Sequence, residues 1–371
     1  MPCPCGKHAA FKRCKPKTVL SSVGHVAVER RYYACRHCKA KQTPWEVWAG
    51  ITGTHRVTPH ARRMIVLAGS GCSFDQASAN LAELAHVRVS NDVVRGVCDE
   101  EGRAVQRWMN DSPAPQQAFA AAKGVVEFST DGLKLNTTGG WREIRLSVMG
   151  KREPAAAPAQ WDDRPLGAPT ARMAICAIAP CGLIGASWTR LRKLLGVPED
   201  QALSVIADGA KWIWEQAARR FTGQEVQWVV DVYHVMLYLC AAAAGLDKQA
   251  AERQVGAWAI ELIERGGPRF IEHLETTGPP GDPTPATAEA WGKLLHYLGD
   301  NRDSLWYGQR LTDGLPIGSG LIEGGCKNVL GKRLKLNSAR WRIRRAERMG
   351  AIRCLQYSGM WATYWDEKYA A

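Results

Sequence analysis

The sequence lacks a hydrophobic run long enough to cross a membrane. Its longest mostly apolar stretch runs from Val232 to Leu246, includes His234, and falls short of the roughly 20 residues that a spanning helix needs. The first twenty residues contain no apolar signal segment, so we expect a cytoplasmic protein with no membrane partner. Acids are also too few to balance the bases: 36 Asp+Glu face 49 Lys+Arg, and the formal net charge is +13.

The composition is that of a folded protein with several domains. At 371 residues and 46% hydrophobic residues the chain can bury a real core, and two or three domains are expected at roughly 100–200 residues each. Twelve cysteines in a long chain without a signal segment favour free thiols and a metal site over a framework of disulfides.

The positive charge is concentrated at the two ends of the chain. Residues 1–63 contain thirteen Lys/Arg and two acids, and residues 327–353 contain ten Lys/Arg and one acid. The remaining residues therefore carry a net charge of −7. A single basic run is usually a solvated face. Two dense basic blocks that also contain Tyr32, Tyr33 and Trp341 favour a nucleic-acid partner.

Composition and periodicity divide the chain into five segments. They are a cysteine module (1–50), a helical region (51–112), an α/β core (123–234), a helical segment (235–315) and a basic C-terminal region (316–371). Between the second and third segments, the Pro/Ala-rich stretch 111–122 is interpreted as a linker.

The α/β core shows short apolar strands interrupted by helical patterns, which predicts a mixed sheet. The expected strands are Val125–Leu135, Trp141–Met149, Ala171–Ala179, Leu203–Ala207 and Val226–Val230, and the expected helices are Ile184–Leu195 and Ile213–Phe221. We expect irregular loops at 153–170 and 276–285.

Helix-start signals in the second segment suggest a helix-turn-helix. Thr58-Pro59 begins one helix, Ser73 can cap a second and Ser90 can cap a third. The short turn around His86 between the last two fits a helix-turn-helix, although an ordinary helical hairpin is the more common arrangement. The basic neighbouring module slightly favours DNA contact.

Four acids are candidate functional residues. Asp131, Asp208 and Asp231 are each expected at the end of a strand, where α/β sheets place their sites, and Glu323 is expected at the start of a helix. Each also has a structural alternative. Asp131-Gly132 and Asp208-Gly209 are turn dipeptides, Asp231 can be a helix N-cap, and Glu323 suits a first helical turn.

Together these carboxylates have the chemistry of a magnesium site. Magnesium binds a few carboxylates and leaves positions for water and phosphate oxygens. Two ions about 3.5–4 Å apart can activate a nucleophile and stabilise the leaving oxygen in phosphodiester cleavage. Such a site requires three or so carboxylates that converge from distant positions in the sequence.

The motifs around these acids resemble those of bacterial insertion-sequence transposases of the DDE type, most closely the Kra group of the mutator-like superfamily. The resemblance covers nearly the whole chain and rests on the order and joint presence of several motifs. They are Ser129-Thr-Asp-Gly-Leu-Lys134, Trp141-Arg-Glu143, Ile206-Ala-Asp-Gly-Ala-Lys-Trp-Ile-Trp214, Val230-Asp-Val-Tyr-His234, Leu315-Pro-Ile-Gly-Ser-Gly-Leu-Ile-Glu-Gly-Gly-Cys-Lys327, Arg333-Leu-Lys335 and Arg340-Trp341.

The resemblance implies an RNase H-like catalytic core with a helical insertion before the last acid. It implies that Asp131, Asp208 and Glu323 bind two Mg²⁺ ions, which Mn²⁺ can replace. It also implies that Asp231 and His234 lie close to the site, where we interpret them as supporting or DNA-contacting residues. The spacing of the residues leaves open whether Asp208 or Asp231 is the second metal ligand.

The start of such chains usually carries two Cys-x-x-Cys pairs around a structural zinc ion. Here the second pair is Cys35 and Cys38, and the first is shortened to Cys3 and Cys5. Zinc takes four N or S ligands, so the expected set is these four thiols, with His8 and Cys14 as substitutes. The resemblance thus implies a zinc-ribbon-like module ahead of a helical DNA-binding region.

The function implied is DNA transposition. The protein is expected to bind the terminal inverted repeats of its element as a homodimer or higher oligomer near the nucleoid, and to catalyse strand cleavage and strand transfer. The expected DNA-binding residues are Lys327, Lys332, Arg333, Lys335, Arg340, Trp341 and Arg342. The alternatives are a DNA-binding regulator without chemistry and a host nuclease specific for nucleic-acid structure.

Overall fold

The computed structural model describes residues 1–51, 53–157, 167–222 and 225–370. The chain forms two compact units. Unit 1 contains Met1–Asp111, Asn136–Gly140 and Leu330–Ala371, and unit 2 contains Ser112–Leu135 and Trp141–Val329. Part of the loop expected at 153–170 lies outside the described residues. Among the described helices, none is both long enough and apolar enough to cross a membrane.

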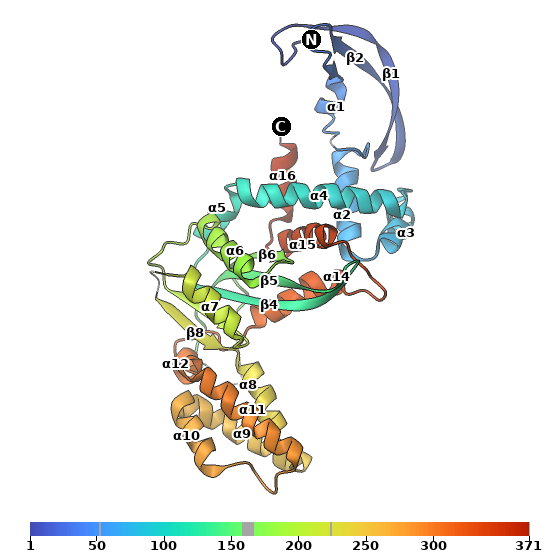
Figure 1. The fold of residues 1–371 in the computed structure, drawn as a ribbon. Coiled ribbons are helices and arrows are strands. Elements are labelled where there is room, and N and C mark those ends of the chain that lie inside the picture. Colours follow the sequence, from blue (N-terminus) through green and yellow to red (C-terminus); the bar gives the residue numbers. More distant parts are fainter. Residues whose placement is uncertain (52, 158–166, 223–224, 371) are drawn as a thin grey trace. The chain divides into compact units, whose positions relative to one another are not determined.

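Unit 1 begins with a long two-stranded ribbon (Figure 1). Strands β1 (Ala9–Ser21) and β2 (Gly24–Cys35) pair antiparallel, with a register shift near Phe11. The short strand β3 (Lys41–Gln42) pairs only with the end of β2, and helix α1 (Pro44–Trp48) follows it. Most of the ribbon is therefore two strands wide.

The rest of unit 1 is helical and combines the N-terminal and C-terminal segments of the chain. Ser73 Oγ accepts the Gln76 N–H at 3.1 Å and Ser90 Oγ accepts the Val93 N–H at 3.4 Å, so both predicted helix starts are confirmed. His86 ends the intervening helix in the left-handed conformation. The helices are α2 (Pro59–Gly71), α3 (Phe74–Ala85), α4 (Asn91–Asp111), α14 (Lys332–Leu334), α15 (Ile343–Tyr357) and α16 (Trp361–Tyr369).

A buried carboxylate joins the two ends of the chain inside unit 1. Glu101 on α4 is 1% exposed and forms an ion pair with Arg62 on α2 at 3.4 Å. It also accepts hydrogen bonds from Tyr364 and Lys368 of α16. Because a buried charge is costly unless it is paired, these contacts fix α16 against α2 and α4.

Unit 2 is built on a mixed five-stranded sheet, as the sequence predicts. The strand order is β6-β5-β4-β7-β8, with β4 parallel to β7, β7 parallel to β8, and β5 antiparallel to β6. Strand β4, the first strand of this sheet along the chain, is thus central. The strands are β4 (Val125–Thr137), β5 (Gly140–Arg152), β6 (Ala171–Ala177), β7 (Leu203–Ala207) and β8 (Val226–Val230).

Helices flank the sheet, and one of them was not expected. The predicted linker at 111–122 is wrong, because α5 (Ala114–Ala121) forms there and buries Phe119. Helices α6 (Cys181–Leu194) and α7 (Lys211–Arg220) lie between the later strands in the sequence. The ring of Trp188 on α6 lies 5.0 Å from the ring of Phe128 on β4, and this aromatic contact forms part of the core.

The helical segment that follows β8 buries Phe270 and Leu294 in a hydrophobic cluster that also includes Val229 and Val230 of β8. Tyr307 fastens it to the sheet by donating a hydrogen bond to the Val230 carbonyl at 2.9 Å. Its helices are α8 (Val232–Ala242), α9 (Lys248–Arg265), α10 (Gly267–Thr277), α11 (Pro285–Asp300) and α12 (Tyr307–Thr312), and α13 (Gly320–Gly325) comes next. Residues 278–284, between α10 and α11, agree with the loop predicted at 276–285.

The Glu101 network predicts a large loss of stability when its centre is removed. The substitution Glu101→Ala leaves Arg62 and Lys368 without their buried partner, so the free energy of unfolding should fall by about 3–5 kcal/mol in urea titrations. Glu83→Ala, at an exposed position of α3, should change it by less than about 0.5 kcal/mol. Equal effects of the two substitutions would contradict the role assigned to Glu101.

Candidate functional site: a carboxylate cluster and a cysteine cluster

Asp131 lies in the middle of the central strand of unit 2. The strand predicted over Val125–Leu135 is confirmed, whereas the expectation that it ends at Asp131 is wrong, and so is the turn alternative, because β4 continues through Gly132 to Thr137. The Asp131 carboxylate accepts the Gly132 N–H at 2.6 Å. The residue stays partly exposed.

Asp208 follows the last residue of β7. Its carboxylate accepts the Ala210 N–H at 2.9 Å, and Gly209 takes φ +85°, which agrees with the turn alternative. Because β7 runs parallel to β4 and next to it, Asp208 comes close enough to Asp131 for their charges to interact. A turn residue can therefore also belong to the site.

Asp231 ends β8 and caps α8, so the predicted N-cap is confirmed. Its carboxylate accepts the Tyr233 N–H at 2.9 Å. The second oxygen, Oδ2, accepts a hydrogen bond from Ser319 and lies 3.3 Å from His234 Nδ1. The side chain is completely buried, which explains why three neighbours are needed to compensate its charge.

Glu323 completes the cluster from α13. Among the described residues, Asp231, His234 and Glu323 form a tight group whose candidate ligand atoms all lie within 4.8 Å of one another. Asp131 and Asp208 are not in that tight group, although Asp131 interacts electrostatically with both Asp208 and Glu323. The structure thus brings all four predicted acids together and places the alternative ligand, Asp231, nearest to Glu323.

Burial and mutual repulsion shape the protonation of these groups. Burial raises the pKa of Asp131, and the neighbouring Asp208 charge adds to the effect. Burial also raises the pKa of Glu323, with Asp231 as the next cause. Burial would raise the pKa of Asp231 too, but its hydrogen bonds outweigh that effect and lower the pKa.

The hydrogen bond between Asp231 and His234 also changes the pKa of the histidine. This bond raises the pKa of His234, which favours the imidazolium form. A positive charge on His234 would offset part of the negative charge of the cluster.

Three supporting residues escaped the sequence reasoning about the site. Ser319 donates to Asp231, and the Cys326 thiol hydrogen-bonds Asp131. Tyr297 of α11 donates to the backbone carbonyl of Asp208 at 2.7 Å. Ser319 and Cys326 lie inside the Leu315–Lys327 motif, so the motif itself was a signal, whereas nothing in the sequence indicated Tyr297.

The donor set of this cluster suits a divalent cation. Carboxylate oxygens are the ligands that hard divalent ions prefer, and an imidazole nitrogen extends the choice to softer ones. Backbone N–H groups occupy one oxygen of Asp131 and one of Asp208, while the Glu323 carboxylate is exposed. Oxygens from three distant segments are therefore available for a metal or for water.

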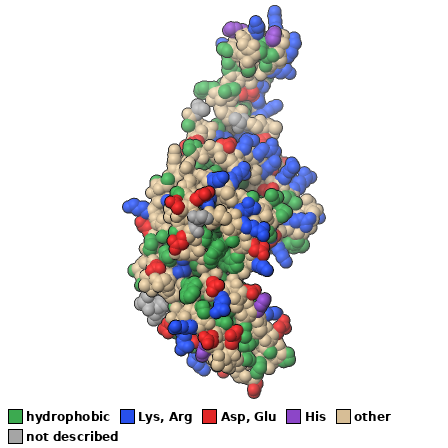
Figure 2. Space-filling model, turned by 60° about the vertical axis from the view of Figure 1, so that its left-hand side comes forward, with side chains coloured by type: hydrophobic (Ala, Val, Ile, Leu, Met, Phe, Trp, Pro, Cys, Tyr) green, Lys and Arg blue, Asp and Glu red, His purple; other side chains and the backbone are tan. Residues whose placement is uncertain are grey.

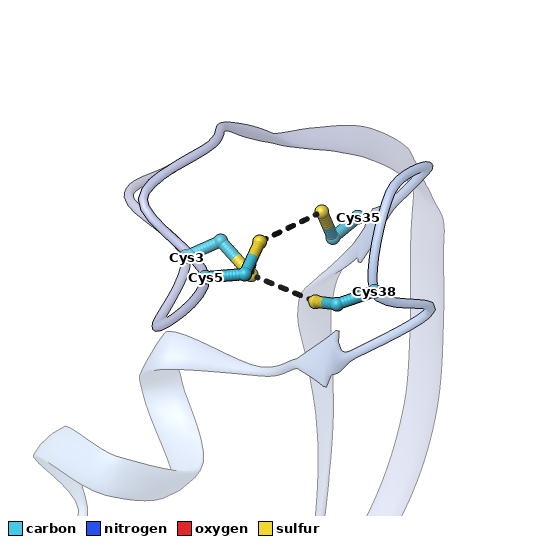
Figure 3. A group of neighbouring side chains, drawn as sticks. All are labelled: Cys3, Cys5, Cys35 and Cys38. Carbon is cyan, nitrogen blue, oxygen red and sulfur yellow. Dashed lines mark hydrogen bonds between the residues drawn. The ribbon is translucent and has the colours of Figure 1, made fainter.

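The predicted cysteine cluster forms a second site, in unit 1 (Figure 3). The Sγ atoms of Cys3 and Cys38 are 3.4 Å apart, those of Cys3 and Cys5 are 3.6 Å apart, and those of Cys5 and Cys35 are 3.7 Å apart. Four thiolates at about 2.3 Å from a zinc ion would form a tetrahedron with edges of about 3.8 Å. The four thiols can therefore hold a metal ion such as zinc.

The backbone prepares one of the four thiols, that of Cys35, for metal binding. The N–H groups of Cys38 and His37 lower the pKa of Cys35 to about 6, and a thiolate is the form that binds metal. Neither predicted substitute, His8 or Cys14, belongs to the metal-binding group found among the described residues. The set Cys3, Cys5, Cys35 and Cys38 is the one that the structure assembles.

Two of the predicted DNA-binding residues need correction. Arg333 and Trp341 are buried in unit 1, where the Arg333 guanidinium lies 4.5 Å from the Phe74 ring and 5.0 Å from the Trp341 ring. Arg333 Nε also donates to the Gly69 carbonyl at 2.8 Å. Both side chains hold α2, α3 and the C-terminal segment together and are not available to a ligand.

The other predicted DNA-binding residues are exposed in their own units. They are Lys327, Lys332, Lys335, Arg340 and Arg342.

Comparison with known proteins adds no assignment. No model of a known protein family matches the chain, and no curated protein matches it.

The cysteine geometry predicts one tetrahedral metal ion per chain. Purified protein should contain about one zinc ion per chain, and Co²⁺ in its place should give the absorption of a tetrahedral thiolate site. Cys35→Ser should lose the metal, because it removes one of the two buried ligands. Cys240→Ser, a substitution at an exposed cysteine of α8, should keep it. Full metal content in Cys35→Ser would contradict the assignment.

Proposed function

We propose that the protein is a DNA transposase of the DDE type, which cleaves and rejoins DNA strands at the ends of its element. The observation that carries the proposal is the convergence of Asp131, Asp208, Asp231 and Glu323 from four separate segments of unit 2. Crowded carboxylates cost free energy through repulsion, and such a cost is usual at functional sites. The exposed bases of the chain provide complementary charge for DNA.

The architecture of unit 2 supports an RNase H-like core as part of this proposal. The sheet is mixed, its first strand is central, and α7 connects the two parallel strands β7 and β8. A helical segment that packs on the end of the sheet stands between β8 and Glu323, where the resemblance implies an insertion. In this proposal the segment returns the chain to the sheet so that Glu323 reaches the aspartates.

The residues have distinct roles in the proposed reaction. Asp131, Asp208 and Glu323 would hold the magnesium ions, with Asp231 as the alternative second ligand. When bound, two magnesium ions supply an activated water or 3′-hydroxyl and stabilise the leaving oxygen of the phosphodiester. His234, whose pKa is raised by its bond to Asp231, can donate a hydrogen bond to a phosphate oxygen at the edge of the cluster.

The proposed partner is double-stranded DNA, first the inverted repeats and then the target. In this proposal zinc stabilises the turns that carry Cys35 and Cys38, and the protein acts as a dimer or higher oligomer at the nucleoid. Figure 2 shows Lys, Arg and His side chains around the N-terminal turns, where Lys7, Arg36, His37 and Lys39 are exposed.

The proposal predicts that single carboxylate substitutions abolish cleavage. Asp131→Ala and Glu323→Ala should each lose Mg²⁺-dependent cleavage of DNA that carries the sequences flanking the gene, because each removes a metal ligand. The dissociation constant for the same DNA should stay within about twofold of the wild-type value, since both residues lie in unit 2 and neither stabilises unit 1. The assay combines strand-break mapping with a gel-shift titration.

Glu289→Ala is the matched control, because it removes an exposed acid of α11 that is not part of the cluster. This variant should cleave DNA at the normal rate. Cleavage by Asp131→Ala at the normal rate would overturn the proposal. Wild-type protein that binds DNA and never cuts it would instead be a regulator, and cleavage of branched DNA without preference for the ends would indicate a structure-specific nuclease.

A second pair of substitutions identifies the second metal ligand. Asp231→Asn keeps the helix cap, because Asn caps helices as well as Asp does, so the fold should survive. If Asp208 is the ligand, Asp208→Asn should weaken Mn²⁺ binding at least tenfold in calorimetric titrations, and Asp231→Asn should weaken it less. The reverse order would assign the role to Asp231.

A further inference from the structure

A groove of about 620 Å³ opens in unit 1 at the base of the β1–β2 ribbon. Thr18 and His25 of the ribbon form one wall, and Arg56 lies in the loop that leads to α2. Arg88 and Ser90, just before α4, form the opposite wall. The groove thus joins the ribbon to the turn of the predicted helix-turn-helix.

The charge of this groove is positive and unbalanced. Its described lining contains two arginines and two histidines but no acid. Arg56 and Arg88 are both exposed, and within the described part of the chain neither takes part in an ion pair. His55 is different, because it already pairs with Glu100 at 3.0 Å. Two guanidinium groups are therefore free to bind an anion from outside.

The two faces of the ribbon differ, and the face that leads into the groove is open. On the other face, Lys17 and Arg30 both form ion pairs with Glu46 of α1. On the open face, Thr18 lies opposite Ala27 and both are exposed.

The residue pairs further along the open face are exposed too. They are Pro16 with Glu29 and Cys14 with Arg31, so the open face runs from Arg31 at one end to His25 and the groove at the other and includes one exposed acid, Glu29.

This open face has no stabilising partner within the described residues. A two-stranded ribbon is marginally stable in water unless one of its faces packs on something. Here α1 contacts one face and the cysteine cluster closes one end, so the open face stays solvated. A two-stranded ribbon of this kind has the width that the DNA major groove accepts.

We propose that this groove and the open face of the ribbon form a binding site for the sugar-phosphate backbone of duplex DNA. Arg56 and Arg88 each contact a phosphate of one strand, and the ribbon follows the adjacent major groove. Phosphate contacts of this type fix the position of a protein on DNA without reading sequence. The inference rests on the proposed function, which identifies the polyanion as DNA. It adds a DNA-binding site outside the basic C-terminal region.

The test measures how DNA binding by the full-length protein depends on salt. Fluorescence anisotropy is recorded with a labelled duplex of random sequence and one from the flanking DNA, at several salt concentrations. Each neutralised phosphate contributes about 0.9 to the slope of log K against log salt. Arg56→Gln with Arg88→Gln should therefore lower the slope by about 1.8 and weaken binding to both duplexes to a similar extent.

A matched double substitution controls for the loss of two charges. Arg253→Gln with Arg269→Gln removes two exposed arginines from helices α9 and α10 of unit 2 and should leave the slope unchanged. Thr18→Glu provides a second variant, because it places a negative charge on the exposed wall of the groove and should weaken binding at every salt concentration. Bound zinc and circular dichroism verify that each variant is folded.

The outcomes separate this inference from the proposed function. Normal binding and an unchanged slope in folded Arg56→Gln/Arg88→Gln and Thr18→Glu proteins would overturn the groove as a DNA site, even if the wild type cleaves DNA. Weakened binding by these variants with no cleavage by the wild type would support the groove and overturn the transposase.

Discussion

Repulsion between carboxylates is the constraint on which the structure of unit 2 depends. The four acids Asp131, Asp208, Asp231 and Glu323 come close together, so the charge of Asp208 helps to raise the pKa of Asp131, and the charges of Asp231 and Asp131 help to raise the pKa of Glu323. Such crowding destabilises a fold unless neighbouring groups compensate it. The compensation is concentrated on the most buried member, where two hydrogen-bond donors and His234 lower the pKa of Asp231 below its ordinary value. The other three acids retain their repulsion, and a cation bound between them would relieve it.

The sheet and the helical segment hold this arrangement against the repulsion. Parallel pairing of β4, β7 and β8 aligns the three aspartates along one side of the sheet. Tyr297 donates to the backbone of Asp208, and Tyr307 donates to the backbone of Val230 directly before the third aspartate. Arg310 extends the same attachment by donating to Gln227 on β8 at 2.8 Å. The helical segment therefore holds the ends of β7 and β8 in place. The next helix, α13, then positions Glu323 at the cluster.

Local signals in the sequence predicted local structure well, and contacts between distant segments account for the errors. Ser73 and Asp231 were recognisable as helix caps, because a cap depends only on the next three residues. Asp131 was misjudged as a strand end, since Asp-Gly resembles a turn when the neighbouring strand is not known. Arg333 and Trp341 looked like DNA-binding residues for a similar reason: their burial depends on α2 and α3, more than 250 residues earlier in the chain. Four acids and four cysteines were selected from the sequence, whereas the tight groups of Asp231 with Glu323 and of the four thiols required the fold.

The central claim is that the four carboxylates form one metal site. Crystals of the full chain grown with Mn²⁺ would test it most directly, through anomalous diffraction at the manganese edge. The account predicts one or two peaks in contact with Asp131 and Glu323, separated by about 3.5–4 Å if both ions are bound. Manganese peaks only at other places, or none at these carboxylates at saturating Mn²⁺, would contradict the account.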